Sequence, residues 1–223
     1  MPEEPYPLDS AESPPYMAAL RLTGVRCVVV GGGAVAERKI ASLLECGAQV
    51  VVFSPMLTPQ LRSLADAGRI TWQARGYASG DIVGARLVCA ATDDVVVNAR
   101  VAAEAQTAGI WVNVADAPER GDFSVPATLR RGDLTVAIST TGGAPGYARR
   151  LRELLEATIG PEYGAALELY ASARPAILAS ERARQAALWD ALFALDLPGV
   201  VRVQGHAEAQ RILATWLEQV GLS

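Results

Sequence analysis

Short apolar runs alternate with amphipathic stretches through the first half of the chain. Runs without polar interruptions are typical of strands that are buried on both faces of a parallel sheet, and apolar residues at intervals of three or four predict helices. Mainly apolar runs cover residues 25–30, 49–53, 87–91 and 110–114, a further strand is expected at 70–74, and the expected helices lie near 34–46, 58–68 and 97–108. Strands that alternate with helices predict an α/β domain, which we place at residues 16–117.

The pattern changes after this domain. Two further extended segments are expected at 123–127 and 134–139, and the Gly-Asp pair at 132–133 between them predicts a hairpin. Beyond Pro145 the chain is almost wholly helical in its pattern, with breaks near 160 and 198. We therefore expect a small strand-containing dimerisation segment at 118–145 and a C-terminal helical domain at 146–223.

The first fifteen residues differ in composition from the rest. They hold five prolines, four acids and no basic residue, which predicts a disordered tail at 1–15. Outside this tail acids and bases balance, which argues against a general nucleic-acid binder. No apolar run approaches the roughly 20 residues of a membrane-spanning helix, so we expect a cytoplasmic protein. The three cysteines and the single histidine show no metal-binding spacing, and we expect no metal site.

A glycine-rich turn follows the first predicted strand. Residues 31–36 read Gly-Gly-Gly-Ala-Val-Ala and fit the pattern G-x-G-x-x-A, in which Gly31 permits a tight turn, Gly33 lets the backbone approach a pyrophosphate, and Ala36 lets helix pack on strand. The helix that follows points its free amide groups and positive dipole end at the phosphates, so Lys39 is not needed for binding. The turn predicts a dinucleotide-binding, Rossmann-like domain; the alternative is an ordinary strand-to-helix turn.

The end of the second strand bears on which dinucleotide binds. An acid there commonly bonds the adenosine ribose, whereas a basic residue accommodates the phosphate of NADP. This chain has Ser54 and Pro55 instead. A serine hydroxyl can form a hydrogen bond with a ribose, and the lack of an adjacent arginine disfavours the additional phosphate of NADP, so we expect NAD. The alternative is that Ser54 and Pro55 merely end the strand.

Polar residues follow the fourth and fifth strands, at the sheet edge where ligands of open parallel sheets bind. Thr92, Asp93 and Asp94 follow the fourth strand, and one of the two aspartates is expected to cap the next helix. Asp116 follows the fifth strand. It is harder to explain as a cap, because the residues after it begin no clear helical pattern.

Five ordered blocks make the chain resemble the precorrin-2 dehydrogenase and sirohydrochlorin ferrochelatase family, which is the sirohaem synthase N-terminal type. The blocks are 28–39, 90–94, 113–118, 122–127 and 137–140, and the resemblance spans Tyr16 to about Glu156. One departure concerns the loop at 139–145, where Thr141 replaces a glycine of the family and Ala144 replaces a serine.

The resemblance implies a function. The family oxidises the macrocycle of precorrin-2 with NAD to give sirohydrochlorin, and some members then insert ferrous iron. The aspartate of its Asn-Val-x-Asp block, which is implicated in the chemistry, matches Asp116 here. Its middle segment exchanges strands between two subunits, which implies a homodimer.

The resemblance also assigns binding residues. Because precorrin-2 carries many carboxylates, its site should offer positive charge, and we expect Arg120, Thr140 and Arg149 to contact the substrate. The residues expected to bind NAD are Gly31, Gly33, Ala34, Val35, Ser54, Pro55, Met56, Thr92 and Asp93.

A regulatory module that senses NAD or NADH without chemistry is the alternative from another functional class. It explains the glycine turn, but it gives no reason for Asp116 and the arginine-rich segment after it. Whether iron insertion is a second activity stays open at this level.

Overall fold

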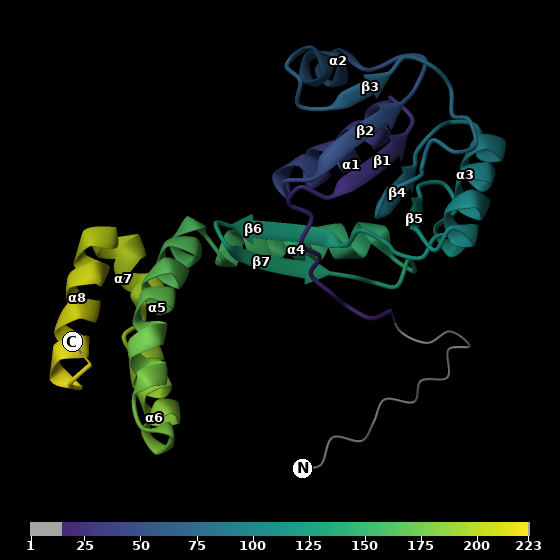
Figure 1. Cartoon of the computed structure of the whole chain (residues 1–223). Coiled ribbons are helices and arrows are strands. Elements are labelled where there is room, and N and C mark those ends of the chain that lie inside the picture. The colour runs from purple at the N-terminus through teal and green to yellow at the C-terminus, as the bar shows by residue number, and fades with distance from the viewer. Residues whose placement is uncertain (1–14, 223) are drawn as a thin grey trace. The chain divides into compact units, whose positions relative to one another are not determined.

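The computed structural model describes residues 15–222, which form two compact units divided between Val125 and Pro126 (Figure 1). The expected tail lies, except for Pro15, outside the described residues.

The division between the units lies eight residues beyond the boundary expected from the sequence, and it splits the expected segment 118–145. The cause is pairing along the last strand of the first unit. The backbone N–H of Asp122 donates to the carbonyl of Val112 (2.8 Å), and the Asp122 carboxylate accepts from the N–H of Val112 (2.9 Å). Residues 118–125, including the short 3₁₀ helix Pro118–Arg120, therefore stay with the first unit.

The first unit contains a five-stranded sheet in which every neighbouring pair is parallel. Its strands are β1 (Arg26–Val30), β2 (Gln49–Phe53), β3 (Thr71–Gln73), β4 (Leu87–Ala90) and β5 (Trp111–Val114). The order is β3-β2-β1-β4-β5, so the chain reverses direction across the sheet between β1 and β4. This arrangement confirms the predicted Rossmann-like sheet and places a ligand-binding crevice at the carboxyl ends of these two strands.

Helices cover both faces of the sheet (Figure 1). The helices are α1 (Ala34–Glu45), α2 (Pro59–Asp66) and α3 (Val95–Thr107). Ile40 of α1 and Leu61 of α2 pack on the face that carries Val29, whereas Val101 of α3 packs on the opposite face beside Val28. Burial on both faces explains why the central strands β1, β2 and β4 consist almost entirely of apolar residues.

Lys39 has a structural place in this unit. Its Nζ donates to Oδ1 of Asn113, and Nδ2 of Asn113 donates to the carbonyl of Phe123 (2.8 Å). Burial lowers the pKa of Lys39. The lysine thus ties α1 to β5 and to the segment beyond it.

The second unit joins a hairpin to five helices. The strands β6 (Ala127–Arg131) and β7 (Leu134–Ile138) pair antiparallel, which confirms the hairpin. The expected strand at 123–127 is wrong. The turn at 132–133 has only two residues and pairs Arg131 with Leu134, so the first strand of the hairpin ends directly before the turn and begins only at Ala127. The helices are α4 (Pro145–Thr158), α5 (Pro161–Ala179), α6 (Arg182–Phe193), α7 (Leu197–Gln204) and α8 (His206–Gln219).

We expect Gly164→Ala to destabilise the second unit. A Cβ at this position of α5 would lie 2.4 Å from the carbonyl oxygen of Arg131, which is a backbone atom, so the helix and the hairpin would have to separate. Such overpacking costs about 1–3 kcal/mol, and chemical denaturation measures it. Gly146→Ala in α4 is the control, because its Cβ would meet no atom within 4 Å and alanine favours a helix. Equal losses in both variants would contradict the close contact.

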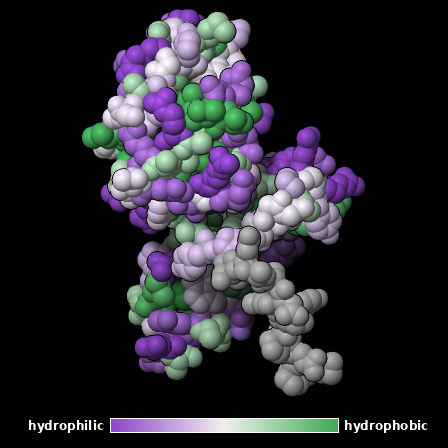
Figure 2. Space-filling model, turned by 90° about the vertical axis from the view of Figure 1, so that its right-hand side faces the viewer, coloured by the Kyte–Doolittle hydropathy of each residue, from purple (hydrophilic) through white to green (hydrophobic). Residues whose placement is uncertain are grey.

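Hydrophobic side chains reach the surface in small groups among hydrophilic ones (Figure 2). Val83, Val95 and Val96 are examples in the first unit. Such exposure is ordinary for a folded domain and identifies no partner. Among the described residues, no helix has the length and hydropathy to cross a bilayer.

Candidate active site

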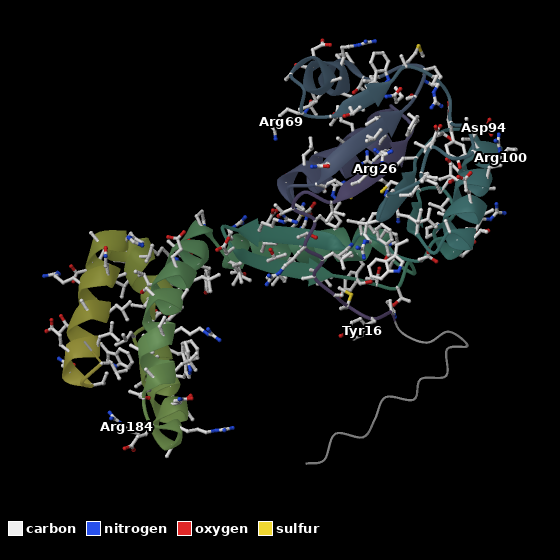
Figure 3. The ribbon with its side chains drawn as sticks, in the orientation of Figure 1. Tyr16, Arg26, Arg69, Asp94, Arg100 and Arg184 are labelled. Carbon is white, nitrogen blue, oxygen red and sulfur yellow. The ribbon has the colours of Figure 1, made fainter. Side chains whose placement is uncertain are left out.

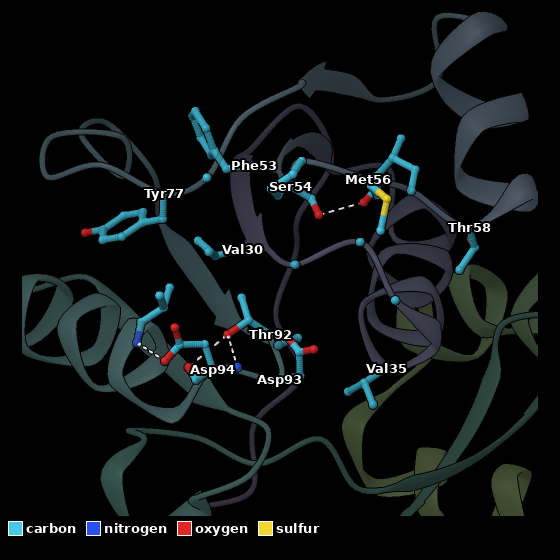
Figure 4. Close-up of a pocket in the computed structure, with 18 of the residues that line it drawn as sticks. Val30, Val35, Phe53, Ser54, Met56, Thr58, Tyr77, Thr92, Asp93 and Asp94 are labelled. Carbon is cyan, nitrogen blue, oxygen red and sulfur yellow. Dashed lines mark hydrogen bonds between the residues drawn. The ribbon is translucent and has the colours of Figure 1, made fainter.

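A cavity of about 760 Å³ opens at the carboxyl ends of β1, β2 and β4 (Figure 4). Its volume lies in the range of small-molecule and cofactor sites. Asp93 and Asp94 are the only charged residues among those that line it. The structure gathers there all nine residues expected to bind NAD: Gly31, Gly33, Ala34, Val35, Ser54, Pro55, Met56, Thr92 and Asp93.

The three glycines of the turn differ in how much space a side chain would have. Gly31 has a φ of +122°, and a Cβ there would lie 2.3 Å from the carbonyl oxygen of Ala91. A Cβ on Gly32 would lie 2.1 Å from the carbonyl oxygen of Met56, whereas a Cβ on Gly33 would meet no atom within 4 Å. Gly31 and Gly32 are therefore required by packing, and Gly33 leaves open space at the N-terminus of α1, where amide groups can meet a phosphate.

The structure gives the Ser54 hydroxyl a local partner. Its Oγ donates to the carbonyl of Met56 at 2.6 Å (Figure 4), and the residue is almost fully buried. Only the lone pairs of this oxygen remain for a ribose. The guanidinium of Arg75 lies 4.9 Å from the centre of the Phe53 ring and is paired with Asp81 (2.6 Å), so its charge is already neutralised.

Tyr77 and Met56 lie on opposite sides of the cavity in Figure 4, and Tyr77 was not expected there from the sequence. The Tyr77 hydroxyl donates to Oε2 of Glu104, and Oε1 of Glu104 accepts from the N–H of Gly80 (2.8 Å). Burial and the bond to Glu104 raise the pKa of Tyr77, and the same bond holds the pKa of Glu104 below its usual value. Glu104 of α3 therefore anchors the loop that carries Tyr77.

We expect this anchor to weaken in acid. Because the folded-state pKa of Glu104 is lowered, mainly by the bond from Tyr77, its contribution is present above its ordinary pKa of 4.5 and is lost as the pH falls through the folded-state value. Glu104→Gln should therefore be less stable than the wild type at pH 7 by at most about 1 kcal/mol, and the difference should shrink below pH 4.5. Urea denaturation at pH 7 and at lower pH measures this; a difference independent of pH would contradict it.

Asp94 caps α3, as expected for one of the two aspartates. Its Oδ1 accepts from the backbone N–H groups of Val96 (2.8 Å) and Val97 (3.2 Å). Figure 3 shows it at one end of the helix, with Arg100 further along. Asp93 is exposed and lines the cavity. The cap fixes the start of α3 beside the cavity.

Asp116 lies just beyond β5, exposed and outside the residues that line the cavity. Its Oδ1 accepts a hydrogen bond from Nδ2 of Asn98 (2.8 Å). Asn98 also bonds Thr92, which does line the cavity. The carboxylate is therefore connected to the nucleotide cavity through one buried side chain that sequence reasoning missed.

The three expected substrate contacts are divided between the units. Arg120 is exposed in the first unit, and its carbonyl accepts from Nε2 of Gln106 (3.0 Å). Thr140 and Arg149 belong to the second unit, where Arg149 pairs with Glu153 (3.1 Å). Thr141, where the family has glycine, adopts a φ of +54°, a conformation that favours glycine.

Among the described residues, no group of three or more histidine, cysteine, aspartate or glutamate side chains is placed to hold a metal ion.

Comparisons with known proteins agree with this geometry. Residues 18–127 match a family described as "Putative NAD(P)-binding", and residues 131–158 match one described as "Sirohaem biosynthesis protein central". Siroheme synthase 1 of Aeromonas salmonicida (strain A449) is 39% identical over 199 residues, which are 88% of this chain and 42% of that protein. Siroheme synthase of Nitrosococcus oceani is 44% identical over 145 residues, which are 65% of this chain and 31% of that protein.

A solved structure shares the fold. SirC, a precorrin-2 dehydrogenase, superposes with a TM-score of 0.68 and 25% identity over 92% of this chain and 99% of that one. The chain spans less than half the length of the siroheme synthases that it matches. The two matched models, these relatives and the shared fold confirm the resemblance of this chain to the precorrin-2 dehydrogenase family of the sirohaem synthase N-terminal type.

Proposed function

We propose that this protein oxidises precorrin-2 to sirohydrochlorin with NAD in sirohaem biosynthesis. The observation that carries the proposal is a carboxylate, that of Asp116, connected by one buried side chain to a dinucleotide-sized cavity. A purely NAD-sensing module needs the cavity but has no use for this carboxylate.

The residues present fit NAD. The open position at Gly33 and the N-terminus of α1 accommodate the pyrophosphate. The end of β2 offers a hydroxyl oxygen and no free cation among the lining residues, which suits a ribose without the phosphate of NADP. Bound NAD supplies the hydride acceptor.

Asp116 would act as the base. Oxidation of the macrocycle removes a hydride and a proton, and the two electrons leave with the hydride. One oxygen of the Asp116 carboxylate accepts from Asn98, so the other is free to take the proton. The exposed position of Asp116 suits access by a large substrate.

Substrate capture and assembly complete the proposal. We assign Arg120, Thr140 and Arg149 to the carboxylates of the macrocycle, since guanidinium groups pair well with them. We also assign a homodimer, because each strand of the two-stranded sheet β6–β7 has one edge without a strand partner among the described residues, and such an edge can pair with a strand of a second copy. Light scattering in solution tests the dimer. We place the protein in the cytoplasm, since Cys27, Cys46 and Cys89 form no disulfide bond among the described residues.

An anaerobic assay with precorrin-2 and NAD tests the function. Formation of NADH together with the absorbance of sirohydrochlorin is the expected result. Ferrous iron added afterwards tests iron insertion, in which iron is a substrate. Binding of NAD without turnover of precorrin-2 would instead favour the sensing module.

A further inference from the structure

Asn98 is a fully buried polar residue of α3, with 0% of its surface exposed. Its Oδ1 accepts from the backbone N–H of Thr92 (3.1 Å) and from the Thr92 hydroxyl (2.8 Å). Its Nδ2 donates to the carbonyl of Thr92 (3.1 Å) and to Oδ1 of Asp116 (2.8 Å). Every hydrogen-bonding position of the amide is thus used.

The orientation of this amide is fixed by its partners. A backbone N–H can only donate, so the oxygen of Asn98 must face the N–H of Thr92. The NH₂ group then faces two acceptors, the carbonyl of Thr92 and the carboxylate of Asp116. Rotating the amide would leave buried groups unsatisfied, at a cost of about 1–3 kcal/mol each.

The position of Asn98 is equally fixed. Asp94 caps α3 four residues before it, and Val101 and Ala105 bury the same side of the helix against the sheet. Thr92 lines the nucleotide cavity and Asp116 does not. Asn98 therefore determines where the carboxylate lies relative to the cavity.

We infer that Asn98 is a positioning residue, which holds one oxygen of Asp116 so that the other faces the substrate at a set distance from the nucleotide. The inference rests on the proposed function. The hydride acceptor and the proton acceptor must both reach the same substrate. A single buried amide that bonds both Thr92 and Asp116 keeps the carboxylate at a fixed distance from the nucleotide cavity.

Asn98→Asp tests the positioning. The aspartate keeps an oxygen for the N–H of Thr92 but replaces the NH₂ group that holds Asp116. We expect kcat to fall about 100-fold, the scale of a misplaced catalytic group, with a much smaller change in the dissociation constant of NAD. Val101→Ala is the matched control: it removes buried atoms from the same helix without touching Asp116, and should lower the melting temperature while kcat stays within about twofold of the wild type. If kcat instead falls in step with stability in both variants, the inference is overturned.

A measurement without turnover separates this inference from the proposed function. In the wild type, the two side-chain N–H signals of Asn98 in ¹H–¹⁵N NMR spectra report the bonds to Thr92 and to Asp116. Asp116→Ala should shift one signal and speed its exchange with solvent. Unchanged signals would refute the bond whatever the enzyme does. Shifted signals in a protein that does not oxidise precorrin-2 would leave the bond standing and reject the proposed function.

Discussion

Replacing Asp116 with asparagine should lower kcat for precorrin-2 oxidation by two to four orders of magnitude, the range expected when a general base is lost. Asparagine has nearly the same shape, and its carbonyl oxygen can still accept from Asn98. It cannot take up a proton. Because Asp116 does not line the nucleotide cavity, the dissociation constant of NAD should change little. Stopped-flow detection of NADH under anaerobic conditions measures kcat, and calorimetry measures NAD binding.

Glu119→Gln is the matched control for this substitution. Glu119 is an exposed carboxylate three residues further along, in the 3₁₀ helix, and its loss removes the same charge from the same segment. It should leave kcat within about twofold of the wild type, since exposed charges interact weakly. If Asp116→Asn retained more than about a tenth of the activity, or if Glu119→Gln lost as much, Asp116 would not be the base.

The sheet was predictable because its signal is local. The central strands β1, β2 and β4 are nearly continuous apolar runs, and the structure buries them on both faces; the edge strand β3 is short and more polar. The hairpin turn at 132–133 also carries a local signal, although the strand before it begins later than expected. Pairing of Asp122 with Val112 is not local, and this is why the domain boundary could not be placed from composition.

The cavity was predictable as a set of lining residues, but not as a set of contacts. Gly32 occupies a variable position of the glycine pattern, yet it is as crowded as Gly31, because Met56 approaches from another loop. Tyr77 enters through a loop whose anchor, Glu104, lies on α3. Both contacts join residues that are far apart in the sequence, so no local sequence pattern predicts them.

Asn98 did leave a signal that sequence reasoning overlooked. It lies three, four and seven residues before Val101, Ala102 and Ala105, which form the buried side of α3. An asparagine at that spacing is a polar residue on an apolar helix face. Since buried amides are hydrogen-bonded, the pattern predicts a partner, although only the structure identifies it as Asp116.

Gly32→Ala and Gly33→Ala should separate folding from nucleotide binding. In Gly32→Ala the new Cβ would lie 2.1 Å from the carbonyl oxygen of Met56 and 2.7 Å from the Ser54 hydroxyl. The backbone carbonyl cannot move without displacing the turn after β2, so the variant should lose about 3 kcal/mol of stability and bind NAD poorly. Thermal denaturation and calorimetry measure the two effects.

Gly33→Ala should behave in the opposite way. Its Cβ meets nothing within 4 Å in the protein, and alanine suits a position whose backbone is extended, so the melting temperature should stay close to that of the wild type. The methyl group would nevertheless occupy the space through which the backbone reaches the pyrophosphate, and the dissociation constant of NAD should rise at least about tenfold, or about 1.4 kcal/mol. A Gly33→Ala protein that binds NAD as tightly as the wild type would show that the pyrophosphate does not lie on this turn. The cavity would then have to hold another ligand or another pose, whatever the fold suggests.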